Sequence, residues 1–127
     1  MITKGISLTH TCVVTQDKTA QALKSGTLPV FGTPSLAALM EETASLSVSS
    51  LLESGFTTVG SHIDLYHVKP SGIGQTVSCT SVLDEVDGRR LVFTITASDE
   101  TGEIGRAGHE RYIVNIEKFM AKVSVKR

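Results

Sequence analysis

Glu41 lies in a stretch of small and apolar residues, and it is the best candidate in the sequence for a catalytic carboxylate. If this stretch is helical, the positions one or two turns away hold small or apolar side chains: Ala37, Ala38, Ala44, Ser45 and Val48. Glu42 points about 100° away from Glu41, so at most one of them lies at the centre of a packed face. A carboxylate in such surroundings could act as a general base or a nucleophile. The alternative is that both glutamates lie on a solvated face.

His67 and Thr33 are two further candidates for chemistry. His67 follows Ile63 and Leu65 at alternating positions, so on a strand it shares their apolar face. It could transfer protons there, although a lone histidine on such a face is more often a hydrogen-bonded core residue. Thr33 precedes Pro34 where a helix is expected to begin, so its hydroxyl could cap that helix. The same hydroxyl could serve as a nucleophile only with the help of a base.

The spacing of Thr33 and Glu41 limits how they could act together. Eight residues separate them, which is about 12 Å along the axis of a regular helix. The two side chains therefore cannot readily touch within one chain. This spacing predicts a site that is shared between two protomers of a dimer.

Arg111 is a candidate for binding an anion. It alternates with His109 and Ile113 on an expected strand and so lies on a partly apolar face. An arginine in that setting usually has a carboxylate or anionic partner. The alternative is an arginine at the sheet edge whose guanidinium reaches water.

The hydrophobic pattern predicts one long helix and several strands around these residues. Strands are expected at 6–14, 57–68, 76–86, 89–98 and 104–116, with a helix at 33–53, a connecting segment at 15–32 and a short basic tail. Residues 19–24 could form a helical turn within the connection. Tight turns at Asp87-Gly88 and Thr101-Gly102 make the sheet antiparallel. The fold class is therefore α+β, with the helix on the apolar face of the sheet; hot-dog and cystatin-like folds both match this order.

Composition and charge exclude several classes of function. The chain has 127 residues, which is typical of a single domain spanning 1–127. Its net charge is −1 and no Lys/Arg block exceeds two residues, so we expect no nucleic-acid partner. No apolar stretch is long enough for a membrane span and the N-terminus does not resemble a signal peptide. The core is lean, with no Trp, which leaves room for an oligomer interface.

The two cysteines indicate neither a disulfide framework nor a metal centre. Cys12 and Cys79 lie in strand-like segments without a CxxC pattern or a histidine at ligand spacing. We therefore expect reduced, at least half-buried cysteines in a cytoplasmic protein. The glycine-rich run PSGIGQ lacks the spacing of a phosphate-binding loop and is interpreted as a turn.

Three runs and their spacing resemble the fluoroacetyl-CoA thioesterase-like family of hot-dog proteins: VFGTPSLAALMEETA, LYHVKPSGIGQTV and VDGRRLVFTITASDETGEIGRAGHERYIVNIEKFMAKV. The resemblance extends from about residue 4 to residue 123. It implies a hot-dog fold with a long central helix, and a catalytic threonine, glutamate and histidine at Thr33, Glu41 and His67. It also implies contacts to the acyl group at Gly60 and Arg111, a homodimer with its active site at the interface, and no metal or other cofactor.

The segment before Thr33 departs from that family. Where the fluoroacetyl-specific member has phenylalanines that form a lid over the acyl pocket, this chain has Lys24 and Thr27, and only Phe31 is nearby. The resemblance therefore implies hydrolysis of a plain short- or medium-chain acyl-CoA. A non-catalytic module that binds acyl-CoA or an acyl carrier is the alternative, and a hydratase on the same fold is a third hypothesis. Candidates for contacting the CoA phosphates are Lys69, Arg89, Arg90 and Lys118.

Overall fold

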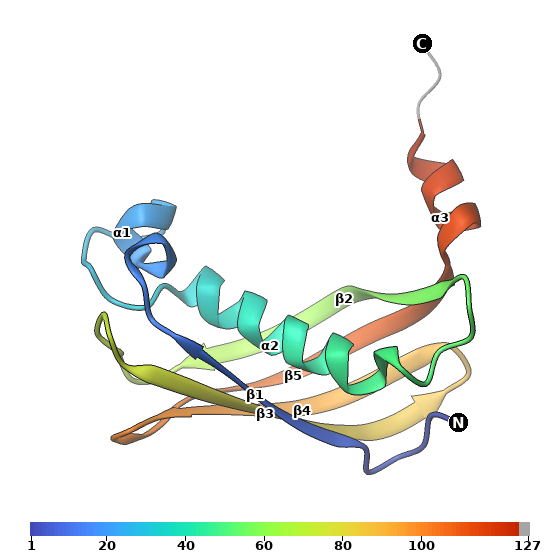
Figure 1. Cartoon of the computed structure of the whole chain (residues 1–127), viewed down its shortest axis with the longest axis horizontal. Coiled ribbons are helices and arrows are strands. Elements are labelled where there is room, and N and C mark those ends of the chain that lie inside the picture. Colours follow the sequence, from blue (N-terminus) through green and yellow to red (C-terminus); the bar gives the residue numbers. More distant parts are fainter. Residues whose placement is uncertain (125–127) are drawn as a thin grey trace.

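A long helix lies across one face of a five-stranded sheet in the computed structural model, which describes residues 1–124 (Figure 1). The elements follow in the order β1 (Ser7–Val13), η1 (Gln16–Lys18), α1 (Ala20–Leu23), α2 (Thr33–Ser49), β2 (Phe56–His67), β3 (Thr76–Asp87), β4 (Arg90–Asp99), β5 (Gly102–Asn115) and α3 (Ile116–Val123). The predicted α+β class, with one long helix against an antiparallel sheet, is confirmed.

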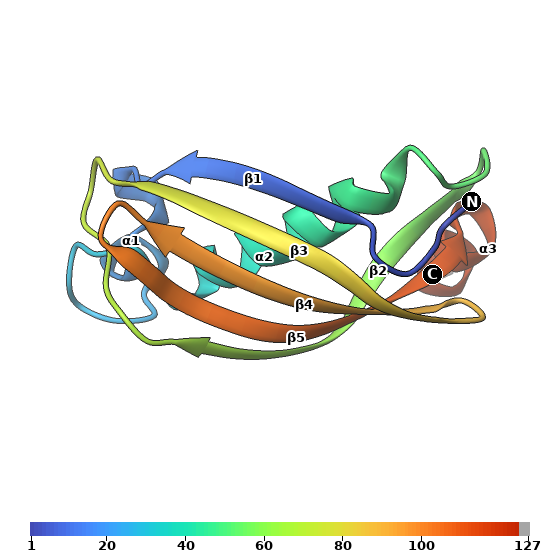
Figure 2. The same cartoon turned by 90° about the horizontal axis from the view of Figure 1, so that it is seen from below.

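The sheet has the strand order β1-β3-β4-β5-β2, and every neighbouring pair is antiparallel. The predicted hairpins join β3 to β4 and β4 to β5, with Gly88 and Gly102 at positive φ in their turns. The view from below shows the strands curving past α2, which lies behind them (Figure 2). Both β1 and β2 are edge strands, which becomes important for the site.

The core lies between α2 and the sheet. On the helix, the fully buried apolar side chains recur every four residues: Leu36, Met40, Ala44 and Val48. The sheet supplies side chains that are equally inaccessible, from three adjacent strands: Val77, Cys79, Leu83, Leu91, Phe93, Ile95 and Ile104. Burial of these apolar surfaces is the main favourable term that holds the helix on the sheet.

Gly105 on β5 gives α2 room to approach the sheet. A Cβ at this position would lie 2.9 Å from Cδ2 of Leu36 and 3.0 Å from the backbone oxygen of Tyr66. The first distance requires the Leu36 side chain to move, and the second requires the backbone of β2 to give by a few tenths of an ångström. The glycine therefore fixes how closely the first turn of α2 packs on the sheet.

The structure corrects three expectations about the helices. The N-cap of α2 is Gly32, so Thr33 begins the helix and does not cap it. The helix ends at Ser49 instead of near residue 53, because Leu51 N–H bonds to Val48 O in a tighter turn. The expected basic tail contains the helix α3, whose first turn is capped when Asn115 Oδ1 accepts from Lys118 N–H.

Cys12 is half-buried and Cys79 is buried, and both are free thiols, as expected. Burial raises the pKa of the Cys79 thiol to about 11, which keeps it protonated and unreactive. Within residues 1–124, no three His, Cys, Asp or Glu side chains gather as a metal site would require. None of the helices in this part of the chain has the length and apolar character to cross a bilayer.

We predict that Gly105→Ala lowers the free energy of unfolding by about 1–3 kcal/mol, because the new methyl group overpacks the contact with Leu36. Gly108→Ala is the matched control on the same strand, since a Cβ there meets nothing within 4 Å. Urea denaturation of both variants measures the difference. Equal midpoints for the two variants would contradict the packing role of Gly105.

Candidate active site

Thr33 and His67 form a hydrogen-bonded pair where the start of α2 meets the end of β2. Thr33 Oγ1 lies 2.9 Å from His67 Nδ1, so the hydroxyl is engaged with the imidazole and makes no cap for the helix. The ring of Phe31 stands edge-on to that of His67, with centroids 6.4 Å apart. The structure therefore brings together two of the three predicted catalytic residues.

The second ring nitrogen of His67 has no partner in the described part of the chain. Nε2 is buried from solvent and forms no hydrogen bond with residues 1–124. A buried polar atom without a partner is costly, so this nitrogen is suited to a group that arrives with a substrate or a second protomer. Burial lowers the pKa of His67, and the backbone of Lys69 opposes that shift. The imidazole is thus favoured in its neutral form, which can accept a proton.

A pocket of about 280 Å³ opens beside this pair. Phe31, Thr33 and His67 form one side of it, and Ala20 and Ser25 contribute from α1 and the segment that follows. Lys69 and its neighbours after β2 complete the rim. Lys24 and Thr27, at the positions of the expected lid, are exposed. The pocket wall near Thr33 is therefore built from small side chains and one aromatic ring.

Glu41, Gly60 and Arg111 form a second cluster between α2 and the sheet. Glu41 comes from α2, Gly60 from β2 and Arg111 from β5. A Cβ on Gly60 would lie 3.9 Å from the carboxyl carbon of Glu41 and 3.2 Å from Nη1 of Arg111. Gly60 therefore keeps open a space that both the carboxylate of Glu41 and the guanidinium of Arg111 border. Glu41 is half-buried, in agreement with its expected small-residue surroundings.

Arg111 is held inside the sheet layer and does not reach out to solvent. Only 7% of its surface is exposed. Its Nε donates to Thr58 Oγ1 at 2.8 Å and its Nη2 donates to Thr58 O at 3.0 Å. Burial lowers the pKa of Arg111 and the charge of Glu41 raises it. This burial is contrary to the alternative of an arginine at the sheet edge whose guanidinium reaches water.

Glu42 points about 100° away from Glu41 around α2, toward β1. It is exposed, and its carboxylate lies 3.2 Å from His10 Nε2 on β1. The adjacent glutamates thus face different edges of the sheet. Only Glu41 points to the cluster with Arg111, which makes Glu42 a natural control for it.

The two clusters are well separated within one chain. Thr33 and Glu41 both lie on the regular helix α2, so about 12 Å of axial rise lies between them. Gly60 and His67 both lie on β2, where seven residues span roughly 23 Å. The structure therefore pairs Thr33 with His67, and Glu41 with Gly60 and Arg111, but it does not join the two sets in one protomer.

His109 is a site residue that the sequence patterns did not single out. It is 1% exposed and lies two positions before Arg111 on β5, with its Nε2 at 3.3 Å from Arg111 Nη1. The available signal was its alternation with Arg111, which places both side chains on one face. Burial lowers the pKa of His109, and the backbone of His62 opposes that shift.

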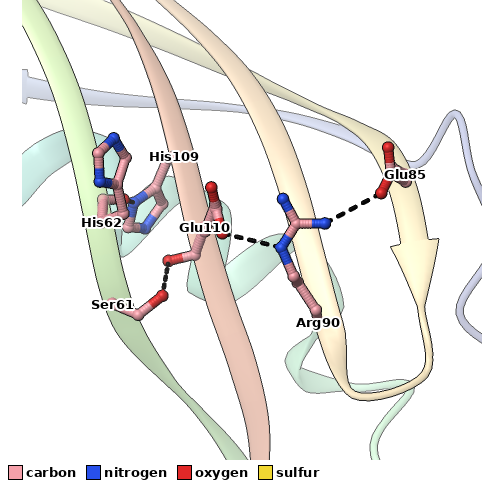
Figure 3. A network of polar contacts seen from close by, with 6 residues as sticks. All are labelled: Ser61, His62, Glu85, Arg90, His109 and Glu110. Atoms are coloured by element: carbon pink, nitrogen blue, oxygen red, sulfur yellow. Dashed lines mark hydrogen bonds and ion pairs between the residues drawn. The ribbon is translucent and has the colours of Figure 1, made fainter.

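Arg90 is already paired within the protein, which weakens it as a candidate for CoA phosphates. Figure 3 shows its guanidinium between two carboxylates: Nε lies 2.9 Å from Glu110 Oε1, and Nη1 lies 3.0 Å from Glu85 Oε2. Lys69 lines the pocket beside His67, and its Nζ donates to Thr101 O at 3.2 Å and has no carboxylate partner in the described part of the chain. Arg89 and Lys118 are exposed.

We predict that the imidazole of His67 titrates below 6.5, its ordinary value. Burial disfavours the charged ring, so protonation requires a lower pH than in an exposed histidine. NMR of the ¹⁵N-labelled protein across a pH series measures this pKa, and His67→Gln identifies the resonance by its loss. A midpoint above 6.5 would show that an anion compensates for burial, contrary to this account.

Comparisons with known proteins converge on one family. The sequence profile of the family described as fluoroacetyl-CoA-specific thioesterase, FlK, matches residues 14–117. The fluoroacetyl-CoA thioesterase of Streptantibioticus cattleyicolor is 36% identical over 128 residues, which cover 96% of this chain and 92% of that protein.

Solved structures agree with the sequence match. A structure of the fluoroacetyl-CoA thioesterase FlK superposes with a TM-score of 0.91 at 35% identity, covering 97% of this chain and 96% of that one. A thioesterase superfamily member from Thermus thermophilus gives a TM-score of 0.89 at 25% identity, with 97% and 91% covered. A hot-dog-like protein from Thermanaerovibrio acidaminovorans, 23% identical, shares the fold with a TM-score of 0.86 over 98% and 94% of the two chains. The chain has the hot-dog fold and belongs to the fluoroacetyl-CoA-specific thioesterase family.

Proposed function

We propose that this protein hydrolyses the thioester of a short- or medium-chain acyl-CoA to the free acid and CoA. The observation that carries the proposal is the pair of clusters, each of which holds part of what the reaction needs. Glu41 with Arg111 offers a carboxylate and an anion-binding group, and Thr33 with His67 offers a hydroxyl and a neutral imidazole. Structures of FlK variants with bound acetyl-CoA, and with fluoroacetate and CoA, support the substrate class.

The edge strand β2 offers a way to join the two clusters. It is 12 residues long and pairs on one side only, with β5. Such an edge is a template for pairing with another chain. If two copies of β2 pair antiparallel about a twofold axis, the His67 end of each strand lies beside the half of its partner that contains Thr58 and Gly60. In the proposed homodimer, Thr33 and His67 of one protomer therefore complete the site of the other.

The chemistry follows from this composite site. Glu41 either attacks the thioester carbonyl carbon to give an anhydride that water then hydrolyses, or it removes a proton from the attacking water. The carbon–sulfur bond breaks in both routes, and the thiolate of CoA leaves with its electron pair. Arg111 and backbone N–H groups near Gly60 would stabilise the developing oxyanion. His67, oriented by Thr33, would relay protons to and from the reacting groups.

The size of the pocket beside Thr33 and His67 supports a short acyl group. Its volume of about 280 Å³ is at the lower end of the range for small-molecule sites. The exposed Lys24 and Thr27 add no aromatic cover, so we propose plain acyl-CoA as a better substrate than the fluorinated compound. The free cysteines, Cys12 and Cys79, are consistent with a cytoplasmic enzyme.

An assay across an acyl-CoA panel that includes acetyl-CoA and fluoroacetyl-CoA, with free thiol as the readout, tests this function. We predict turnover of short plain acyl chains without added metal. Tight binding of acyl-CoA without release of thiol would instead support the non-catalytic binding module.

Substitutions at the two clusters test the assignment of roles. We predict that Glu41→Ala and His67→Ala each lower kcat/KM by about 10²-fold or more, as expected for removal of general acid–base groups. Glu42→Ala is the matched control, because it alters the neighbouring carboxylate, which lies beside His10 of β1 and not beside Gly60. The same assay, with circular dichroism as a check of folding, measures all three. A loss in Glu42→Ala equal to that in Glu41→Ala would reject the assignment.

A further inference from the structure

We infer that His109 is the positioning residue for Arg111, which it holds in the orientation that faces Glu41 and the acyl group. The inference deepens the proposed function and rests on it, since the benefit of fixing Arg111 lies in the thioesterase site. His109 itself contacts no reacting atom in this account. It acts through the hydrogen bond between its Nε2 and Nη1 of Arg111, 3.3 Å apart.

The surroundings of His109 fix its ring in one place. It lies in the sheet with 1% of its surface exposed. The ring packs against Phe93 of β4 with centroids 6.1 Å apart, and Nδ1 lies 2.7 Å from the backbone oxygen of His62 on β2. Figure 3 shows the two histidines side by side on neighbouring strands. The pairing of β2 with β5 shifts register between Gly60 and His62, and such a bulge re-aims the groups on either side of it.

The partners of His109 determine which nitrogen carries the proton. An arginine can only donate hydrogen bonds, so Nε2 of His109 must accept from Arg111 through its lone pair. A backbone oxygen can only accept, so Nδ1 must carry the hydrogen and donate to His62 O. The geometry therefore specifies the neutral Nδ1–H tautomer, and both ring nitrogens are satisfied.

His109 contacts Nη1 of Arg111, the nitrogen that borders the space beside Glu41. Thr58 accepts from Nε and Nη2, which leaves Nη1 as the nitrogen that His109 can restrain. Nη1 is also the Arg111 atom nearest to the open space above Gly60, 3.2 Å from the position of a Cβ there, with the carboxyl carbon of Glu41 at 3.9 Å from the same point. With Thr58 on one side and His109 on the other, the guanidinium plane cannot rotate freely.

Protonation of His109 would break this arrangement. The imidazolium would present an N–H to a guanidinium that also only donates, and two positive charges would lie in one buried space. Burial and the charge of Arg111 on β5 lower the pKa of His109, whereas the backbone of His62 on β2 and the carboxylate of Glu41 on α2 raise it; the His62 side chain adds a smaller lowering effect. Phe93, the neighbour on β4, does not titrate.

Two substitutions separate the positioning role from a structural one. In His109→Asn the side-chain amide nitrogen can replace Nδ1 and donate to His62 O, but no atom reaches Arg111. In His109→Gln the side-chain oxygen can reach the place of Nε2 and accept from Arg111, but the donor to His62 is lost. We expect kcat to fall by about 10- to 100-fold in His109→Asn, since a hydrogen bond to a charged group is lost. His109→Gln is expected to retain about tenfold more activity than His109→Asn.

A purely structural role would give the reverse order, because His109→Asn keeps the bond to the backbone and His109→Gln does not. That order would overturn the inference. Adding His109→Asn to Arg111→Lys should cause little further loss in kcat, as expected when one residue acts through the other. A full additional loss in the double variant would also contradict it.

A readout without turnover separates this inference from the proposed function. In the resting ¹⁵N-labelled protein, a restrained Arg111 gives resolved guanidinium NMR signals. We expect these signals in wild type and His109→Gln, and their broadening in His109→Asn. Unchanged signals in His109→Asn would reject the positioning role, whereas absence of thioesterase activity in wild type with the expected signals would reject only the proposed function.

Discussion

The distance between Glu41 and His67 is the constraint on which the account of this protein depends. Glu41 faces Gly60 near the middle of α2 and β2, whereas His67 bonds to Thr33 at the far end of both elements. A helix and a strand are stiff, so no side-chain rotation within one chain can close the gap. The buried Nε2 of His67 remains without a partner in residues 1–124. In a dimer paired along β2, the Thr33–His67 pair of one protomer would lie beside the Glu41 cluster of the other. Dimer assembly is therefore part of the proposed catalysis.

Small residues at two points set how the helix and the sheet meet. Gly105 allows Leu36 to approach β5 at the start of α2. Gly60 leaves room for Arg111 and for Glu41, which follows Leu36 on α2 by five residues. A methyl group at Gly105 would crowd Leu36 and the Tyr66 backbone, and one at Gly60 would lie 3.2 Å from Nη1 of Arg111. How closely α2 lies on the sheet therefore affects both the packing of the core and the distance between Glu41 and Arg111.

The sequence predicted most of the strands, the long helix and the candidate site residues. The features that it did not predict have identifiable physical reasons. Alternating patterns and Asp-Gly or Thr-Gly turns predicted the antiparallel strands, and small-residue periodicity predicted α2. The helix α3 was missed because its formation depends on the Asn115 cap, a local hydrogen bond within a short basic segment. Thr33 was expected as a cap because caps are common, but its hydroxyl bonds to a histidine that is 34 residues away. His109 was missed because the atoms it contacts, the His62 backbone oxygen on β2 and the ring of Phe93 on β4, come from distant parts of the sequence.

Activity of a mixed dimer tests the shared site most directly. Glu41→Ala and His67→Ala chains with different affinity tags would be co-expressed, and the heterodimer purified by both tags. In a composite site, one of the two sites lacks both groups and the other is intact, so the heterodimer should show about half of the wild-type activity while each parent homodimer is inactive. A purified heterodimer as inactive as its parents would contradict a site built from Glu41 of one protomer and His67 of the other.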